Sequence, residues 1–265
     1  MPSPTVSWSS AATAKAYSYR ERAGSLGLPG LLFRAGEKTQ ATFVVDALRA
    51  DTPFIAGTVT GQYASDSSIP RMLASSFVGI PLERSVPNIV LLGSGLGMLK
   101  LAGIGLGGRQ KLSLEGDFDR SFTLYCPEGY ERDALEIFTP NLMQRLVDTT
   151  GGCDVELVDD WMFVYSRPGR YRDGQALEAI ESATALVQST IHRQTARYAD
   201  GRVTPLRSAT VSPEEHAARA GGVATEGRRV KTSSTRLQKV VLALSWAVFL
   251  VAAGYVTLTW LLPRL

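Results

Sequence analysis

The chain has few of the residues that metal and redox sites need. Its 265 residues include only two cysteines, Cys126 and Cys153, and two histidines, His192 and His216. Two histidines are too few for a three-histidine metal site, and no spacing of Cys and His matches a zinc pattern. In a reducing compartment, two such cysteines are most often small buried hydrophobic residues. We therefore expect no metal site and no cofactor.

The sequence also lacks a recognisable catalytic constellation. No Ser or Cys motif points to His192, and His216 lies in a polar segment. Asp159 and Asp160 are adjacent, which predicts the turn of a β-hairpin and not two carboxylates that converge on a substrate. A nucleophile, a base and an orienting group cannot be assembled from these residues. We expect a protein that is not an enzyme.

Most of the chain has no net positive charge, and the basic excess is concentrated near its C-terminal end. Residues 1–201 carry 19 Lys or Arg and 22 Asp or Glu, whereas residues 202–239 carry eight basic and three acidic residues. The slightly acidic larger part argues against binding to nucleic acid. A basic segment beside a membrane span is instead attracted to anionic lipid headgroups.

What the sequence does have is a long apolar run, Val240 to Leu262, without a charged residue. As a helix it would reach about 34 Å, and the hydrocarbon core of a bilayer is about 30 Å thick. The run therefore predicts a single transmembrane helix at residues 240–262, in a tail-anchored topology.

Side chains within this run predict contact with a second helix. Ala243, Ala247 and Gly254 form a stripe of small residues, which lets membrane helices approach closely, and Ser245 is able to hydrogen-bond across such a contact. The span also contains Trp246, and Trp260 lies near its far interface with water. We therefore predict partners among other integral membrane protein subunits.

Five basic residues precede the span: Arg228, Arg229, Lys231, Arg236 and Lys239. Basic flanks stay on the cytoplasmic side of a membrane. The large N-terminal part is therefore expected in the cytoplasm, with the single span in the inner (plasma) membrane. No signal peptide competes with this orientation, because the first residues contain no apolar core. The five basic side chains are predicted to contact anionic lipid headgroups.

Four segments are expected along the chain. They are an N-terminal surface arm with at most a short helix (1–30), a cytoplasmic α+β domain (31–200), a basic flexible linker (201–239) and the span (240–262). A flexible linker of this length would have a root-mean-square reach of about 35 Å, so the domain would move well away from the bilayer.

Within the domain, periodicity predicts mainly antiparallel strands and two to three packed helices. Strands are expected at residues 42–48, 54–64, 75–82 and 88–92, in two short runs around Asp117, and in the hairpin at Asp159. Helices are expected at residues 129–138, 140–148 and 173–198. Thr139 before Pro140 is a good helix start, because the Thr hydroxyl is able to accept from a free backbone amide. The fold class is therefore α+β.

Glycines are unusually dense in the stretch between Gly93 and Gly108, LLGSGLGMLKLAGIGLGG. A dinucleotide fingerprint would have a glycine in place of Met98, and a Walker loop would place Lys100 after a glycine and before Ser or Thr. A structural glycine-rich strand and loop fits the stretch better. The alternatives are a membrane-tethered nucleotide- or ligand-binding sensor or enzyme, and a stretch that dips into the membrane interface with Lys100 at headgroup level.

Residues 112–166 resemble a bacterial, mainly actinobacterial, family of membrane-anchored domains with an LEGDF…FTLYC…FTPxLM…VYS pattern. The matching positions are Leu114, Glu115, Phe118, Phe122, Tyr125, Ala134, Thr139, Pro140, Leu142 and Met143. The resemblance implies a membrane-attached domain and brings no known catalytic residue. In size and topology the chain is also similar to accessory subunits of the actinobacterial cytochrome bcc-aa3 supercomplex. Both likenesses imply a non-catalytic accessory or adaptor subunit of a larger membrane complex.

Overall fold

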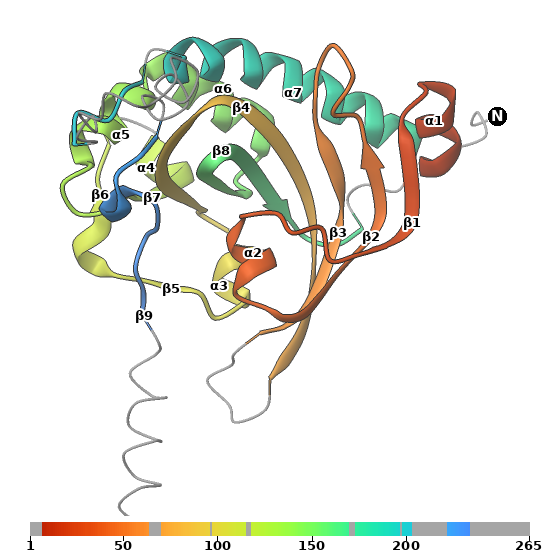
Figure 1. Ribbon diagram of the computed structural model, residues 1–265, viewed down its shortest axis with the longest axis horizontal. Helices are drawn as coiled ribbons and strands as arrows, with labels where there is room; N and C mark the ends of the chain where they lie inside the picture. The colour runs from red at the N-terminus through yellow and green to blue at the C-terminus, as the bar shows by residue number, and fades with distance from the viewer. Residues whose placement is uncertain are drawn as a thin grey trace, which may run out of the picture.

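The computed structural model describes residues 7–63, 70–95, 97–114, 118–169, 173–196, 198–202 and 222–233. Within these residues the chain forms a curved antiparallel sheet with helices on both faces (Figure 1). The predicted span lies outside the described residues, as do Arg236 and Lys239. Among the helices that are described, none is long and apolar enough to cross a membrane.

The main sheet has the strand order β1-β2-β3-β4-β7-β6, and β8 pairs with the other edge of β4. Every pairing in it is antiparallel, which agrees with the predicted fold class. The strands are β1 (Ser18–Gly24), β2 (Glu37–Asp46), β3 (Ile55–Tyr63), β4 (Arg71–Gly93), β6 (Lys111–Leu112), β7 (Phe122–Tyr125) and β8 (Asp154–Ser166). A second, two-stranded sheet pairs β5 (Gly105–Leu106) with β9 (Thr232–Ser233).

Strand β4 is the centre of the sheet and replaces the two strands predicted at residues 75–82 and 88–92. It is continuous over 23 residues. Its pairing with β8 shifts register on both sides of Val86, in the part of the strand that contains Pro81 and Pro87. Proline has no backbone N–H to donate to the hydrogen-bond ladder between strands. The regular pairing is therefore interrupted at this point, and the strand bends but does not end. Figure 1 shows β4 curving around β8.

Helices cover the two faces of the sheet unequally. One face packs against α1 (Trp8–Ala14), α4 (Phe118–Ser121), α5 (Glu131–Ile137), α6 (Pro140–Thr150) and α7 (Gly174–Thr195). The other face packs against two short helices, α2 (Leu31–Arg34) and α3 (Met98–Leu101). Two single-turn 3-10 helices complete the described elements, η1 (Gly108–Gln110) and η2 (Thr225–Gly227). The more heavily covered face therefore holds most of the hydrophobic core.

The predicted helix at residues 173–198 is confirmed as α7. Its apolar stripe is buried against the sheet, with Leu177 and Ile191 fully buried. The Asp173 side chain caps the helix by accepting from Ala176 N at 2.8 Å. The helix predicted after Thr139 is confirmed as α6, with Pro140 in its first turn, but the predicted cap hydrogen bond is wrong. The buried Thr139 hydroxyl has no hydrogen-bond partner within the described part of the chain.

The hairpin predicted at Asp159 and Asp160 is wrong. Residues 154–166 form one strand, β8, which pairs with β4 along both halves. Asp159 has a φ of 52° and pairs with Val86 between the two register shifts, so it lies at a bulge. Aspartate tolerates this left-handed conformation better than most residues. The Asp-Asp pair therefore forms a bulge and not a turn, and the bulge changes the direction of the Asp159 side chain.

The N-terminal arm predicted at residues 1–30 is also wrong for its described part. Residues 8–14 form α1, and residues 18–24 form β1, which pairs with β2 at the edge of the sheet. Trp8 is only 5% exposed, and its Nε1 donates to Phe43 O at 2.9 Å. The arm therefore belongs to the folded body. As an edge strand with mostly exposed side chains, β1 has no apolar alternation by which the sequence could reveal it.

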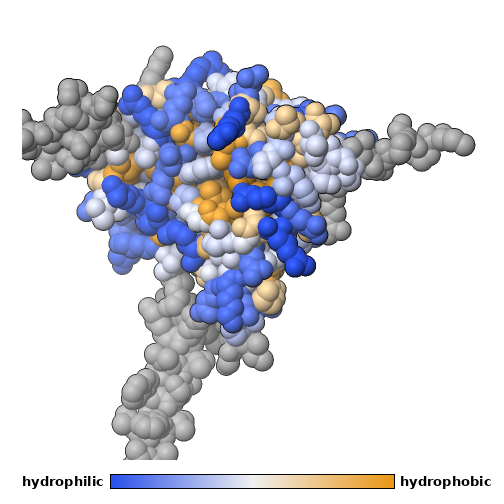
Figure 2. Space-filling view, turned by 45° about the vertical axis from the view of Figure 1, so that its right-hand side comes forward, coloured by the Kyte–Doolittle hydropathy of each residue, from blue (hydrophilic) through white to orange (hydrophobic). Residues whose placement is uncertain are grey.

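Most of the surface in Figure 2 is hydrophilic, with a hydrophobic area in the middle of the face shown. Large hydrophobic side chains that are exposed include Phe43 (49%) and Met72 (64%). Phe43 has a φ of 53°, where β2 shifts register against β3. A bulky residue in this conformation strains the backbone.

We expect Phe43→Gly to be more stable than Phe43→Ala by about 1 kcal/mol, because both variants lose the ring but only alanine keeps the left-handed strain. At Met72, which is also exposed but lies in ordinary strand backbone, the order should reverse. Denaturant unfolding of the four variants compares the two sites. If alanine is more stable than glycine at position 43 as well as at position 72, the backbone at Phe43 is not strained.

Candidate functional site

Residues 222–233, which we call the exit segment, lead from the folded body toward the predicted span. They were predicted to be part of a flexible linker, and this part of the prediction is wrong. Val223 is 5% exposed and Val230 is 4% exposed, and they join the cores on the two faces of the sheet. A chain of ordinary linker composition is thus held along the body by specific contacts.

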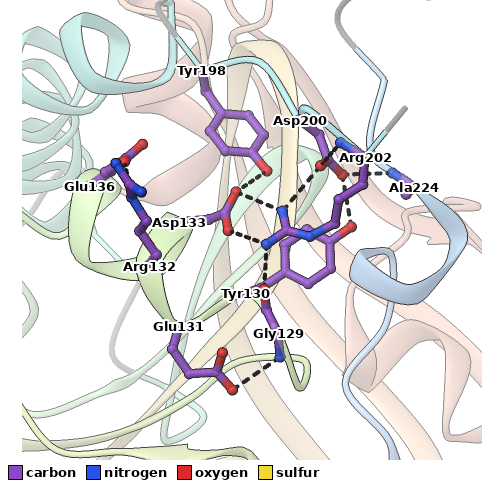
Figure 3. A network of polar contacts seen from close by, with 10 residues as sticks. All are labelled: Gly129, Tyr130, Glu131, Arg132, Asp133, Glu136, Tyr198, Asp200, Arg202 and Ala224. Atoms are coloured by element: carbon purple, nitrogen blue, oxygen red, sulfur yellow. Dashed lines mark hydrogen bonds and ion pairs between the residues drawn. The ribbon is translucent and has the colours of Figure 1, made fainter. Parts of the chain in front are cut away.

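The first contact holds the start of the exit segment. The carboxylate of Asp200 accepts from Ala224 N at 2.9 Å and from the Tyr130 hydroxyl at 2.7 Å (Figure 3). It also accepts from Arg202 N at 3.0 Å. Burial opposes ionisation of this group, but the hydrogen bonds together outweigh burial and lower the pKa of Asp200. Asp200 therefore binds the chain both before and after residues 203–221.

Tyr130 is the platform for this contact. The Arg202 guanidinium stacks over its ring, 4.0 Å from the centroid, and also pairs with Asp133 at 3.0 Å. Figure 3 shows Arg202 lying between the two aspartates, with Tyr198 donating to Asp133. Gly227 packs so closely on the Tyr130 ring that a Cβ at this position would collide with it. The glycine is thus required by the close approach.

The second contact uses the bulge in β8. Asp159 accepts from both terminal nitrogens of Arg229, at 2.8 and 2.9 Å. Both side chains are about one-third exposed, so water screens the pair and its contribution is modest, about 1 kcal/mol or less. The bidentate geometry nevertheless fixes the direction of the exit segment. The left-handed backbone at Asp159 therefore has a role: it aims the carboxylate at Arg229.

The third contact is fully buried. The Asn88 side chain accepts from Val230 N at 2.8 Å and donates to Leu157 O at 2.8 Å and to Glu156 at 3.3 Å. Asn88 has no exposed surface. Its amide therefore joins three parts of the chain, the exit segment, β4 and β8, in one place.

Glu156, behind Asn88, is a buried carboxyl group. It accepts from Leu31 N at 2.7 Å and from the Tyr165 hydroxyl at 3.0 Å. Burial raises the pKa of Glu156 to about 7, although these hydrogen bonds and the charge of Arg34 act in the opposite direction. The support of the exit segment thus contains one group that changes its protonation near neutral pH.

The fourth contact is a reciprocal amide pair at the end of the exit segment. Gln110 accepts from Lys231 N at 2.8 Å and donates to Lys231 O at 2.9 Å. Immediately afterward β9 pairs with β5, with Thr232 opposite Leu106. The Gln110 side chain therefore makes the two hydrogen bonds to Lys231 that the backbone of a paired strand would make, and so continues the small sheet.

The glycine-rich stretch begins beside another buried carboxyl group, Asp154. This group accepts from Gly93 N at 2.9 Å and from Leu99 N at 2.8 Å, at the first turn of α3. A Cβ at Gly97 would collide with it. A bound phosphate would need these same amides. Because Asp154 already occupies their position, the geometry favours the structural reading of the stretch over nucleotide binding.

Three further features of the described residues bear on a metal, catalytic or ligand site. Among these residues, no three His, Cys, Asp or Glu side chains are grouped to hold a metal ion. His192 lies 3.2 Å from Pro81 O and 3.5 Å from Glu83. A cavity of about 160 Å³ beneath α7 is lined mainly by aliphatic side chains such as Ile180 and Met162. The arrangement as a whole is suited to holding chain segments together.

The predicted site residues have different positions in the structure. Arg229 binds Asp159, not a free surface, whereas the side chains of Arg228 and Lys231 are exposed. Arg236, Lys239 and the packing residues of the span lie outside the described residues. Sequence reasoning missed Asn88 and Gln110, because a single amide beside apolar residues gives no local signal of its distant partner.

No protein-family model and no curated protein matches the chain. Among solved structures, the crystal structure of the mycobacterial trehalose monomycolate transport factor A is similar, with a TM-score of 0.44 and 10% sequence identity. The similarity covers 69% of this chain and 92% of that chain. A likeness of this size does not identify a function.

Proposed function

We propose that this chain is a non-catalytic accessory or adaptor protein of the inner membrane, anchored by its C-terminal run, with a cytoplasmic α+β domain that serves a larger membrane assembly. The observation that carries the proposal is the docked exit segment. Because the folded domain binds the segment that leads to the membrane, the orientation of the domain relative to neighbouring subunits is fixed. The exit segment is held by its backbone at Ala224, Val230 and Lys231.

The docked segment also changes the expected distance from the bilayer. Only seven peptide steps separate Ser233 from Val240. Fully extended, they reach about 24 Å. The domain is therefore held beside the membrane surface, in contrast to the long free linker that composition predicted. A domain held at the surface is placed to contact the cytoplasmic parts of other membrane subunits.

The stripe of Ala243, Ala247 and Gly254 supports a partner within the membrane. The resemblance of residues 112–166 to actinobacterial membrane-anchored domains points in the same direction. The specific assembly that we propose is the respiratory cytochrome bcc-aa3 supercomplex, in which the chain would be an accessory subunit. The chain is similar to accessory subunits of that assembly in size and topology.

Purification of the full-length chain in a mild detergent should recover integral membrane subunits in fixed stoichiometry, as identified by quantitative mass spectrometry. Replacing Ala243 and Ala247 with leucine should remove these subunits without releasing the chain from the membrane, because the stripe could no longer approach a partner helix. Phe249→Leu, on the opposite side of the predicted helix, is the matched control. Recovery of the unaltered chain as a bare monomer would reject the adaptor function.

A further inference from the structure

The body carries a cluster of exposed cations around the point where the exit segment leaves it. We call this the basic face: Lys100, Arg109, Lys111, Arg228 and Lys231. Lys100 belongs to the glycine-rich stretch, and Arg109 and Lys111 follow it directly. From the sequence, lipid contact is predicted for Arg228 and Lys231, and for Lys100 only in the alternative in which the glycine-rich stretch enters the membrane interface. Their common location is the feature that the sequence could not show.

Contacts between the two segments bring these cations together. Gln110 lies between Arg109 and Lys111 in the sequence, and its side chain holds Lys231 by two hydrogen bonds. Strand β5, between Lys100 and Arg109, pairs with β9 directly after Lys231. Figure 1 shows α3, β5 and β9 on the side of the body away from α7. The basic face therefore lies on the two segments that meet where the exit segment ends.

Few acidic groups balance this charge. Residues 97–114 contain three cations and no Asp or Glu, and residues 222–233 contain three cations and one Glu, Glu226. Arg229 is already paired with Asp159. Asp160, the neighbour of Asp159, is a further exposed acid next to this region. These two segments together thus carry a net charge of +5, whereas the rest of the chain is slightly acidic.

We propose that the basic face rests on the anionic phospholipid surface of the membrane in which the chain is anchored. This inference rests on the proposed function. The short connection from Ser233 to Val240 keeps the end of the exit segment, where Lys231 lies, within about 24 Å of the start of the predicted span. Because the tether already holds the face there, individually weak contacts with headgroups suffice to seat it. Leu101 and Leu106 are partly exposed between the cations and lie at the same surface.

Lysine acetylation of the full-length chain in nanodiscs tests this contact. In nanodiscs that contain phosphatidylglycerol, acetylation of Lys100, Lys111 and Lys231 should be slower by about threefold or more than in pure phosphatidylcholine. Lys15, which pairs with Glu181 on α7, is the internal control and should not change. Salt at 0.5 M should remove the difference, because exposed charges are then screened.

A charge-reversed chain gives the second readout. Lys100→Glu, Arg109→Glu and Lys111→Glu together should abolish the protection of Lys231, which is itself unaltered. Arg20→Glu, Arg22→Glu and Arg49→Glu together, on exposed positions of β1 and the loop after β2, should preserve it. Equal acetylation rates in both lipids, with the chain integrated in the nanodiscs, would overturn this inference alone. Failure of the chain to enter nanodiscs would instead overturn the proposed function.

Discussion

Asn88→Ala is expected to free the exit segment from the body and to lower the free energy of unfolding by about 3 kcal/mol. The substitution leaves the buried Val230 N–H and Leu157 C=O without their present partner. Each unsatisfied buried group costs about 1–3 kcal/mol. Glu156 also loses a donor, which adds to the cost. The effect is large because Asn88 is completely buried and water cannot replace it.

Hydrogen exchange of the full-length chain in detergent, read by mass spectrometry, separates local release from global unfolding. Amides of residues 228–231 should exchange about 100-fold faster in the variant, because about 3 kcal/mol corresponds to two factors of ten. Asp159→Asn is the matched control, since its ion pair is partly exposed and should change exchange by less than tenfold. Unchanged protection of the exit segment in a folded Asn88→Ala chain would refute the role of Asn88.

Glu156→Gln is expected to remove a pH dependence of stability. The folded-state pKa of about 7 lies above the ordinary value of 4.5. Between these two pH values the folded chain keeps a proton that the unfolded chain has lost. The stability that Glu156 contributes is therefore complete below pH 4.5 and is lost as the pH rises through 7. The loss amounts to about 3 kcal/mol, because one pKa unit corresponds to about 1.4 kcal/mol.

Denaturant unfolding at several pH values between 4.5 and 8 measures this difference. Relative to the unaltered chain, Glu156→Gln should gain about 3 kcal/mol across that range. The glutamine NH2 group faces either the Asn88 amide or the Leu31 N–H, donor against donor, which adds a cost that does not depend on pH. Glu136→Gln, an exposed substitution on α5, is the control and should keep the original slope. Parallel profiles for all three chains would show that Glu156 is not the titrating group.

Elements whose side chains repeat on one face were predictable from the sequence. The stripe of α7 and the strand at Ile55–Tyr63 are examples, because burial against a single surface imposes the period of a helix or a strand. Local signals failed where a distant contact decides the conformation. Asp159 and Asp160 have the composition of a turn, yet the pairing of β8 with β4 on both sides keeps the chain extended there.

The ordered structure of the exit segment could not be predicted from the sequence for a related reason. Its composition is that of a linker, and only Val223 and Val230 are large apolar residues that it buries. Three of the partners that order it, Asn88, Gln110 and Asp159, are 70 or more residues away along the chain. The same applies to Asp154, whose contact with the glycine-rich stretch decides against a phosphate in that position. Long-range polar contacts of this kind have no sequence period by which to find them.

Sedimentation of the full-length chain after cell breakage tests the central claim, that the C-terminal run anchors this domain in the membrane. We expect the chain to stay in the membrane pellet after ultracentrifugation and after an alkaline carbonate wash. A chain that ends at Ser233 should be released by the wash, because the basic face alone binds through charges that the solution screens. Full-length chain in the supernatant would contradict the membrane anchor and, with it, the proposed adaptor function.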